Sequence, residues 1–397
     1  MKQFALTSYV LYFLGGLVLT VTGAVLPQLL DYYNLSYTRG GQLVFLGSLG
    51  FLIGVPTSTL LLGRLSEKNL LALATAIIAT AQVGIFSLPS FQFILLFSFL
   101  NGVGVAALEV IIATVMMELF IGRRAVVMSY LEVSFGIGAL LMPLVASFFI
   151  NYYNWRYSFL FTSILAIVLI VICKAIHFNR RDSLKEDTKP LDASPSSSKL
   201  LDKHARWKVL GLSIVMIFMC AGIESSLNNF LPSIFITYLN ALPSYASLSI
   251  GVFWVAMLIG RIATGWVIRK ITYERYLLFG ISGTIISLIL FILLKNIFLG
   301  YLLLLLLGLS MSGLYSITMV YANHKVDGQN RLVTSLITGF SGLGGAISPA
   351  IIGFSMDQVG TRLALYYIVG FGFIYLVALF IIFFIKDKVN YSIAEEM

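Results

Sequence analysis

The sequence predicts an all-α membrane protein whose twelve transmembrane helices form two parallel repeats of six. Hydrophobic residues make up 59% of the 397 residues and charged residues only 11%, which is more apolar surface than a soluble domain can bury. The apolar residues fall into twelve runs, most of them long enough for one helix to cross a bilayer. Glycines, a proline and loop cations also recur at one fixed offset between the first six runs and the last six.

The twelve runs are continuous rather than alternating, which indicates helices and not the strands of a membrane barrel. The first run is too long for the core of a signal peptide and has no small-residue cleavage motif after it, so we expect it to be retained. The runs cover residues 5–30, 41–62, 69–88, 93–119, 126–150, 157–177, 209–238, 246–268, 276–294, 297–321, 332–356 and 363–385.

The distribution of lysine and arginine predicts the orientation in the membrane. With the N-terminus inside, 21 of the 26 cations fall on the cytoplasmic side, four fall outside and Arg261 lies within a span. Cytoplasmic loops of membrane proteins carry this excess of positive charge. Both termini are therefore predicted to be cytoplasmic.

The polar stretch 178–208 divides the chain into two halves. It carries many mixed charges and the serines near residue 196, so we interpret it as a cytoplasmic linker between six-helix bundles at 1–177 and 209–397. An offset of 206 residues superimposes similar residues of the two bundles, as expected for internal repeats. The matching pairs are Gly16 and Gly222, Gly54 and Gly260, Arg64 and Lys270, Gly102 and Gly308, Gly136 and Gly342, Gly138 and Gly344, Pro143 and Pro349, and Arg156 and Arg362.

Glu109 is the first candidate for a functional charge within the spans. A charge at a helix centre costs about 2.5–3.5 kcal/mol on insertion scales, so each one needs a reason. Glu109 lies 14 residues from Arg123, near the expected membrane midplane, and its own span holds no cation. It could bind and release a proton as a central cavity opens to either side. The alternative is a hydrogen-bonded structural carboxyl.

Glu224 is a second midplane acid, 16 residues after Lys208, and Asn228 and Asn229 follow it by about one helical turn. An acid and amides on one helix face can hydrogen-bond the hydroxyls of a polyol, so these three residues are candidates for binding a solute. Hydrogen bonding between helices is the competing interpretation. Weaker candidates for the same site are Trp254, which could stack on a sugar ring, Tyr315, which takes the repeat position of Glu109, and Asn101.

Glu132 and Arg261 lie at matching depth, because each is 8 residues from a cytoplasmic arginine, Arg124 and Arg269 respectively. Opposite charges at one depth can pair across the two halves and close a cytoplasmic gate. The alternatives are that Arg261 pairs within its own half or extends its side chain toward the membrane surface.

Motifs of enzymes and metal sites are missing from the sequence. It has no phosphate-binding glycine loop with lysine, and the three histidines and two cysteines lack the spacing of metal ligands. We therefore expect a protein that is not an enzyme, binds no cofactor and no nucleic acid, and uses an ion gradient as its energy source.

Several stretches resemble a known family of transporters. The loop Gly63–Lys68 is similar to a degraded form of the major facilitator signature, and Leu108–Glu109 matches an acid of the fourth span. The likeness extends over essentially the whole chain. The stretches that resemble bacterial glucose/mannose:proton symporters, in the fucose/galactose/glucose:proton symporter branch, are Leu131–Leu140, Ala221–Glu224 with Asn229–Ile234, and Phe253–Val255 with Ile259–Arg261.

This resemblance implies a major facilitator fold with the solute site between the halves and Glu109 as the proton-coupling acid. It also implies that the fifth and eighth spans face each other, which would let Glu132 and Arg261 meet. Fucose permeases use an aspartate in the first span, and residues 5–30 contain none, so the hexose-type members are the closer match.

We therefore expect proton-coupled uptake of a hexose or similar small polar solute by alternating access, carried out by a monomer in the bilayer of a bacterial inner membrane. One alternative is a proton-driven efflux antiporter for drugs or other amphipathic molecules. A second is a membrane sensor that signals through residues 178–208. Protons are the only coupling species that the sequence predicts.

Overall fold

The computed structural model describes residues 2–62, 64–120, 124–175, 203–326 and 330–395, and all regular structure in these ranges is helical. The predicted connector at 178–208 lies mostly outside the described residues. The helices are α1 (Lys2–Tyr32), α2 (Tyr37–Leu62), α3 (Glu67–Phe86), α4 (Phe91–Leu119), α5 (Arg124–Tyr152), α6 (Tyr157–Ala175), α8 (Lys203–Leu239), α9 (Pro243–Val267), α10 (Tyr273–Leu294), α11 (Ile297–Met311), α12 (Leu314–Lys325), α13 (Asn330–Gln358) and α14 (Thr361–Glu395).

Twelve stretches of the described chain are long and apolar enough to cross a membrane, as the hydrophobic runs predict. The tenth is made of two helices, because α11 and α12 are separated at Ser312 and Gly313. The helix α8 begins at Lys203, within the stretch that the sequence assigns to the connector. The charged residues at the start of α8 therefore form the first turns of a long helix.

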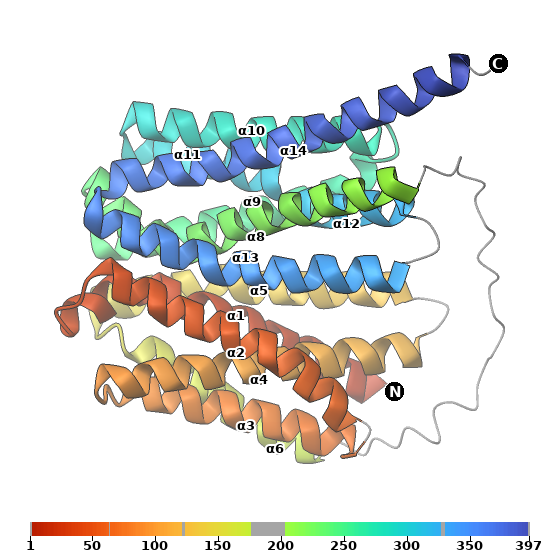
Figure 1. The fold of residues 1–397 in the computed structure, drawn as a ribbon. Helices are drawn as coiled ribbons and strands as arrows, with labels where there is room; N and C mark the ends of the chain where they lie inside the picture. Colours follow the sequence, from red (N-terminus) through yellow and green to blue (C-terminus); the bar gives the residue numbers. More distant parts are fainter. Residues whose placement is uncertain (1, 63, 121–123, 176–202, 327–329, 396–397) are drawn as a thin grey trace.

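The helices run side by side along one common direction (Figure 1). Helices α1–α6, here called the N-terminal group, lie in the lower part of the view, and α8–α14, the C-terminal group, lie above them. The start of α1 and the end of α14 are at the same end of the bundle. We call this end the terminal face, and the other end, where α1 ends and α2 begins, the opposite face.

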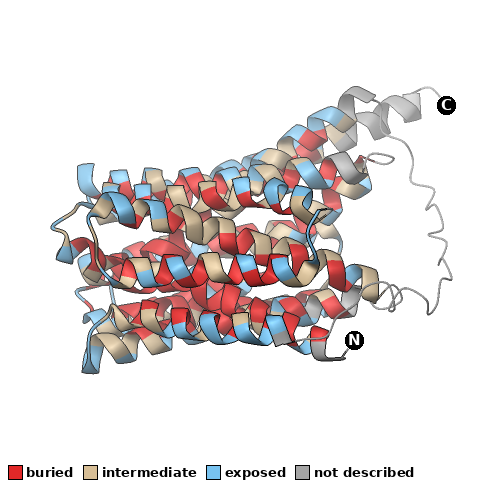
Figure 2. Ribbon diagram, turned by 90° about the horizontal axis from the view of Figure 1, so that it is seen from below, coloured by how far each residue is buried: buried red, intermediate tan, exposed pale blue. Residues whose placement is uncertain are grey.

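The outside of the bundle is apolar. Buried and exposed positions alternate along the helices (Figure 2), and many exposed positions carry large hydrophobic side chains, such as Phe298 at 85% and Leu60 at 74% exposure. A soluble monomer rarely leaves so much apolar surface open, whereas a bilayer solvates it. The chain is therefore a multi-pass membrane protein.

Two glycines show why small residues recur at an offset of 206. A Cβ added to Gly54 in α2 would lie 3.0 Å from the carbonyl oxygen of Val103 in α4, and one added to Gly260 in α9 would lie 3.1 Å from that of Leu309 in α11. Each glycine lets its helix approach the backbone of a neighbour. The contacting residues are themselves separated by the same offset.

Gly102 gives a test of this packing. A Cβ at Gly102 would clash with the carbonyl oxygen of Gly47 in α2, whereas nothing lies within 4 Å of a Cβ at Gly265 in α9. Overpacking costs about 1–3 kcal/mol, so Gly102→Val should lower the melting temperature of the purified protein by several degrees. The matched change Gly265→Val should leave it near the original value. Equal melting temperatures for the two variants would contradict the close packing of α2 and α4.

Candidate functional site

One arginine joins the two groups of helices. The guanidinium of Arg261 in α9 lies with Nη1 3.5 Å from Oε2 of Glu132 in α5 and with Nη2 3.7 Å from Oε1 of Glu224 in α8. The three side chains are partly open, with exposures of 32%, 54% and 24% respectively. Arg261 therefore holds one carboxylate from the N-terminal group and one from its own group.

The structure thus brings together Glu132 and Arg261, as their matching depth predicts. It also contains the contact that we considered as the alternative, because Arg261 pairs with Glu224 within the C-terminal group. Sequence depth alone did not place Glu224 beside the arginine. Whether the Glu132–Arg261 pair acts as a gate stays a prediction.

Trp254 packs beneath this ion-pair cluster. The guanidinium carbon of Arg261 lies 5.5 Å from the ring centroid of Trp254, and the indole N–H donates a 2.8 Å hydrogen bond to Oδ1 of Asn228. The ring centroids of Trp254 and of Phe135 in α5 lie 6.2 Å apart. With only 2% exposure, Trp254 has no open face on which a sugar could stack in this conformation. Its contacts instead fix the positions of Asn228 and Arg261.

Asn229 lies next to these residues but has a local partner. Its Nδ2 donates to the carbonyl oxygen of Ser225, 2.8 Å away, and the Ser225 hydroxyl donates at 2.7 Å to the carbonyl of Gly345 in α13. Both Asn228 and Asn229 are buried, at 3% and 8% exposure. In this conformation the Asn228 amide links α8 to α9, the Asn229 amide bonds within α8, and the Ser225 hydroxyl links α8 to α13.

Glu109 faces the same region from α4. It interacts electrostatically with Glu132, and its backbone carbonyl accepts a 3.1 Å hydrogen bond from the hydroxyl of Tyr12 in α1. Among the described residues no cation lies within salt-bridge distance of its carboxylate. Two carboxylates, Glu132 and Glu224, therefore pair with the guanidinium of Arg261, while Glu109 faces Glu132 and has no cationic partner among the described residues.

Tyr315 reaches the site because of the break in the tenth span. It follows Gly313, where a Cβ would clash with the hydroxyl of Tyr276, so the chain passes close to α10 before α12 begins. The Tyr315 hydroxyl lies near the side chains of Thr338 and Ser341 in α13, and Tyr315 interacts electrostatically with Glu224. Tyr315 thereby lies on the C-terminal side of the cluster.

Asn101 belongs to a different polar network. Its Oδ1 accepts a 3.0 Å hydrogen bond from Nε2 of Gln82 in α3, and Oε1 of Gln82 accepts one of 3.1 Å from the hydroxyl of Thr162 in α6. This network joins α3, α4 and α6 within the N-terminal group. The structure does not bring Asn101 into contact with Arg261 and its partners, so a solute-binding role for Asn101 has only its sequence position as support.

Sequence reasoning missed two aromatic residues of the site, Tyr12 and Phe135. Their ring centroids lie 6.4 Å apart, and together they connect the Glu109 backbone to the Trp254 ring. Aromatic residues are common in membrane spans, so nothing in their type or spacing distinguishes them. Phe135 does lie in the stretch Leu131–Leu140 that resembles the symporters, which was the available signal.

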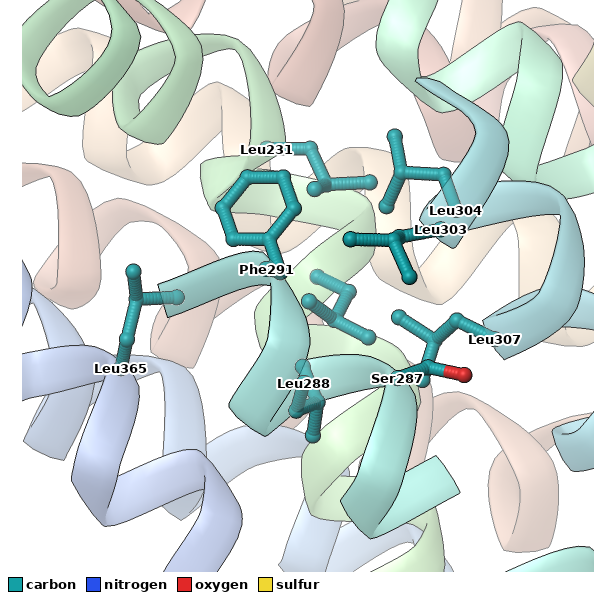
Figure 3. A pocket seen from close by; sticks show the side chains of 9 residues that line it. Leu231, Ser287, Leu288, Phe291, Leu303, Leu304, Leu307 and Leu365 are labelled. Carbon is teal, nitrogen blue, oxygen red and sulfur yellow. The ribbon is translucent and has the colours of Figure 1, made fainter. Parts of the chain in front are cut away.

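An apolar pocket in the C-terminal group is not a candidate for a polar solute (Figure 3). It lies among α8, α10, α11 and α14, and the hydroxyl of Ser287 is the one polar group on a labelled side chain around it. A polyol needs several hydrogen-bonding partners, which this lining lacks. The lining residues are Leu227, Leu231, Ser287, Leu288, Phe291, Leu303, Leu304, Leu307 and Leu365.

The side chains of the cluster can form hydrogen bonds and ion pairs. They offer carboxylate, guanidinium, amide, indole and phenol groups, and among the described residues no three His, Cys, Asp or Glu side chains gather as metal ligands. The cluster lies at the junction of the two groups of helices. This position suits a site that changes when the groups move against each other.

Comparison with known proteins gives the family. The family model described as Major Facilitator Superfamily matches residues 8–331 and 213–396, two overlapping segments that together span most of the chain. The glucose/mannose transporter GlcP of Bacillus subtilis is 32% identical over 355 residues, which are 89% of this chain and 88% of the relative. The TsgA homolog of Buchnera aphidicola is 21% identical, over 85% of this chain and 84% of that protein.

Solved structures share the fold at lower identity. A variant of the nucleoside transporter NupG superimposes with a TM-score of 0.79 at 13% identity and covers 96% of this chain and 99% of that one. The D-xylose-proton symporter superimposes with a TM-score of 0.75 at 16% identity, with 96% of both chains covered. The family model, the glucose/mannose transporter and the two solved structures are those of membrane transporters rather than enzymes. We conclude that this chain is a member of the Major Facilitator Superfamily.

Proposed function

We propose that this transporter takes up a hexose together with protons by alternating access, with both termini in the cytoplasm of a bacterial cell and the chain in its inner membrane. The observation that carries the proposal is the ion-pair cluster, in which Glu132 and Glu224 both pair with Arg261 while a third acid, Glu109, faces Glu132. The 32% identity to a glucose/mannose transporter over 89% of the chain supports the choice of solute.

The charge imbalance supports proton coupling through Glu109. Glu132 and Glu224 both lie beside Arg261. Glu109 instead faces another acid, Glu132, and forms no salt bridge with any described cation. A carboxylate without a counter-ion in a low-dielectric site is costly, and binding one proton removes that charge. Glu109 is therefore the acid of the cluster that we assign to proton uptake and release.

The composition of the cluster supports a polyol as the solute. Carboxylate oxygens accept hydrogen bonds from hydroxyl groups, and guanidinium and amide N–H groups donate to them. Glu224 and Arg261 are both partly open, so a hydroxylated solute could replace their mutual contact. Asn228 and Asn229 lie on the same helix as Glu224. If their present partners move, Oδ1 of Asn228 becomes free to accept a hydrogen bond from a solute hydroxyl and Nδ2 of Asn229 becomes free to donate one.

The contact between Glu132 and Arg261 is assigned to the gate, because it crosses between the N-terminal and C-terminal groups. Alternating access requires such contacts to form on one side of the solute and break on the other. Since Arg261 also pairs with Glu224, binding of a solute at Glu224 would change how strongly Arg261 holds Glu132. We place the solute site and the gate side by side on this arginine.

Counterflow tests the proposed solute. Proteoliposomes loaded with unlabelled glucose, mannose or galactose are diluted into a trace of the labelled sugar with no ion gradient, so that only exchange drives accumulation. We expect transient accumulation for at least one hexose, and we expect Glu224→Gln to weaken it about tenfold or more, because hydrogen bonds to charged groups contribute about 1.5–3 kcal/mol. Loss of the carboxylate of Glu118, a Glu118→Gln change in α4, is the control. Absence of counterflow for every hexose would contradict the proposal.

A further inference from the structure

The start of α2 is capped by a carboxylate from the other group of helices. The N–H of Tyr37 donates a 3.0 Å hydrogen bond to Oδ1 of Asp357, near the end of α13, and the N–H of Thr38 donates one of 2.6 Å to Oδ2. The hydroxyl of Thr38 donates to Oδ2 as well. A single side chain thus accepts three hydrogen bonds across the junction between the groups.

These bonds complete the start of the helix. The first four N–H groups of a helix have no partner within it, and they form a site that favours negative charge. In α2 the N–H groups of Arg39 and Gly40 donate to the carbonyl oxygen of Ser36, at 3.1 and 3.3 Å. The other two of these four N–H groups, those of Tyr37 and Thr38, donate to Asp357. The cap that most helices take from their own chain segment is here supplied by α13.

The helices beneath the cap are packed at backbone distance. A Cβ added to Gly41 in α2 would lie 2.9 Å from the Cα of Ala350 in α13, and one added to Gly353 would clash with the carbonyl oxygen of Tyr37. The capping bonds can therefore form only when α2 and α13 are in contact at the opposite face. When the groups separate there, the start of α2 loses its cap.

The repeat shows that this cap is specific to one of two equivalent junctions. The offset of 206 pairs Asp357 with Asn151 at the end of α5, and pairs Thr38 with Ser244 at the start of α9. The helix α9 has Pro243 at its first position, which needs no N–H partner there. The α5–α9 junction is joined instead by the hydroxyl of Ser247, which donates to the carbonyl of Pro143 at 3.3 Å.

We propose that the hydrogen bonds from Tyr37 and Thr38 to Asp357 form a latch that biases the transporter toward the conformation in which the opposite face is closed. The latch acts without touching the solute site, through the cap that α2 keeps or loses. It rests on the alternating access proposed above, but not on the identity of the solute or on proton coupling.

Thiol labelling measures the closure directly. Ser247 is fully buried at the opposite face and contacts Pro143 of the other group. In a background with Cys173→Ala and Cys220→Ala, the change Ser247→Cys places one thiol at this junction. The protein is reconstituted in lipid nanodiscs, which leave both faces accessible, and the rate of reaction with a polar maleimide is recorded. This rate follows the fraction of molecules in which the junction is open.

We expect Asp357→Ala to raise the labelling rate about fivefold, which corresponds to the usual effect of losing a helix cap. Asp357→Asn keeps one acceptor oxygen without the charge and should give a smaller increase. Asn151→Ala, at the equivalent position of the other junction, should leave the rate unchanged. If Asp357→Ala does not fold, Thr38→Val removes the hydroxyl donor from the other side and should raise the rate in the same direction.

Two outcomes would overturn the latch, and they are distinguishable. Equal labelling rates with and without Asp357 would show that the cap does not bias the conformation, while alternating access would be unaffected. No labelling in any variant would show that the opposite face does not open at all, which contradicts alternating access and the latch together.

Discussion

Replacement of Arg261 by glutamine is expected to reduce hexose transport at least about tenfold. The change leaves Glu132 and Glu224 without their shared cation, and removing one partner of a buried charge pair costs about 3–5 kcal/mol. The exposures of 24–54% at this cluster reduce that cost through solvent screening. The initial rate of counterflow in proteoliposomes measures the effect.

The design of the control follows from the second contact of Arg261. Adding Glu224→Gln to Arg261→Gln removes one of the two stranded carboxylates, so the double variant should be more stable to heating than the single one. Arg269→Gln changes an exposed arginine at the end of the same span and should transport normally. Normal transport by Arg261→Gln, or no gain in stability for the double variant, would contradict the role given to the shared arginine.

Replacement of Glu109 by glutamine is expected to abolish concentrative uptake while exchange continues. The amide keeps the size of the side chain but cannot bind and release a proton, so a proton gradient no longer drives the solute. Counterflow needs no net proton movement and should persist, because the Arg261 contacts with Glu132 and Glu224 do not involve this side chain.

The matched control for Glu109 is Glu118→Gln, a carboxyl nine residues further along α4. That variant should accumulate the solute as the original protein does. If Glu109→Gln still accumulates the solute when a proton gradient is imposed, another group carries the proton. If it loses counterflow as well, Glu109 acts in binding or in folding rather than in coupling.

The helices could be predicted from the sequence because the bilayer imposes a simple requirement. A span needs a continuous apolar run, so composition placed the twelve spans near the helices found in the structure. The same reasoning could not find the break between α11 and α12, because residues 297–321 contain no charged residue and their hydrophobic pattern is that of one span. That break depends on the packing of Gly313 against Tyr276 in α10, which is a tertiary contact.

Contacts of the site could be predicted only where the depth of a residue in the membrane, counted from the nearest loop, was enough to place it. Glu132 and Arg261 are at the same distance from loop arginines, and the structure brings them within 3.5 Å. Glu224 lies 16 residues from Lys208 along a helix that starts earlier than the apolar run suggests, so its depth did not indicate the contact with Arg261. Side-chain length and the direction of the helix face decide such contacts, and neither is visible in a single sequence.

The residue type alone did not predict the contacts of polar side chains within the spans. Asn101 and Asn228 are both amides within apolar helices, yet one joins Gln82 in the N-terminal group and the other accepts from Trp254 next to the charged cluster. Asp357 looks like an ordinary helix-end acid in the sequence. Its contact with Thr38 joins residues 319 positions apart in the chain, and only the assembled fold brings them together.

The central claim is that solute and proton move together, and solute-induced proton flux tests it most directly. Proteoliposomes that contain a pH-sensitive dye are prepared with no pH difference and no membrane potential, and glucose is then added outside. We predict that the lumen becomes more acidic as glucose enters, and that Glu109→Gln abolishes this acidification while glucose exchange continues. Entry of glucose into the proteoliposomes of the original protein without any change in luminal pH would contradict the account.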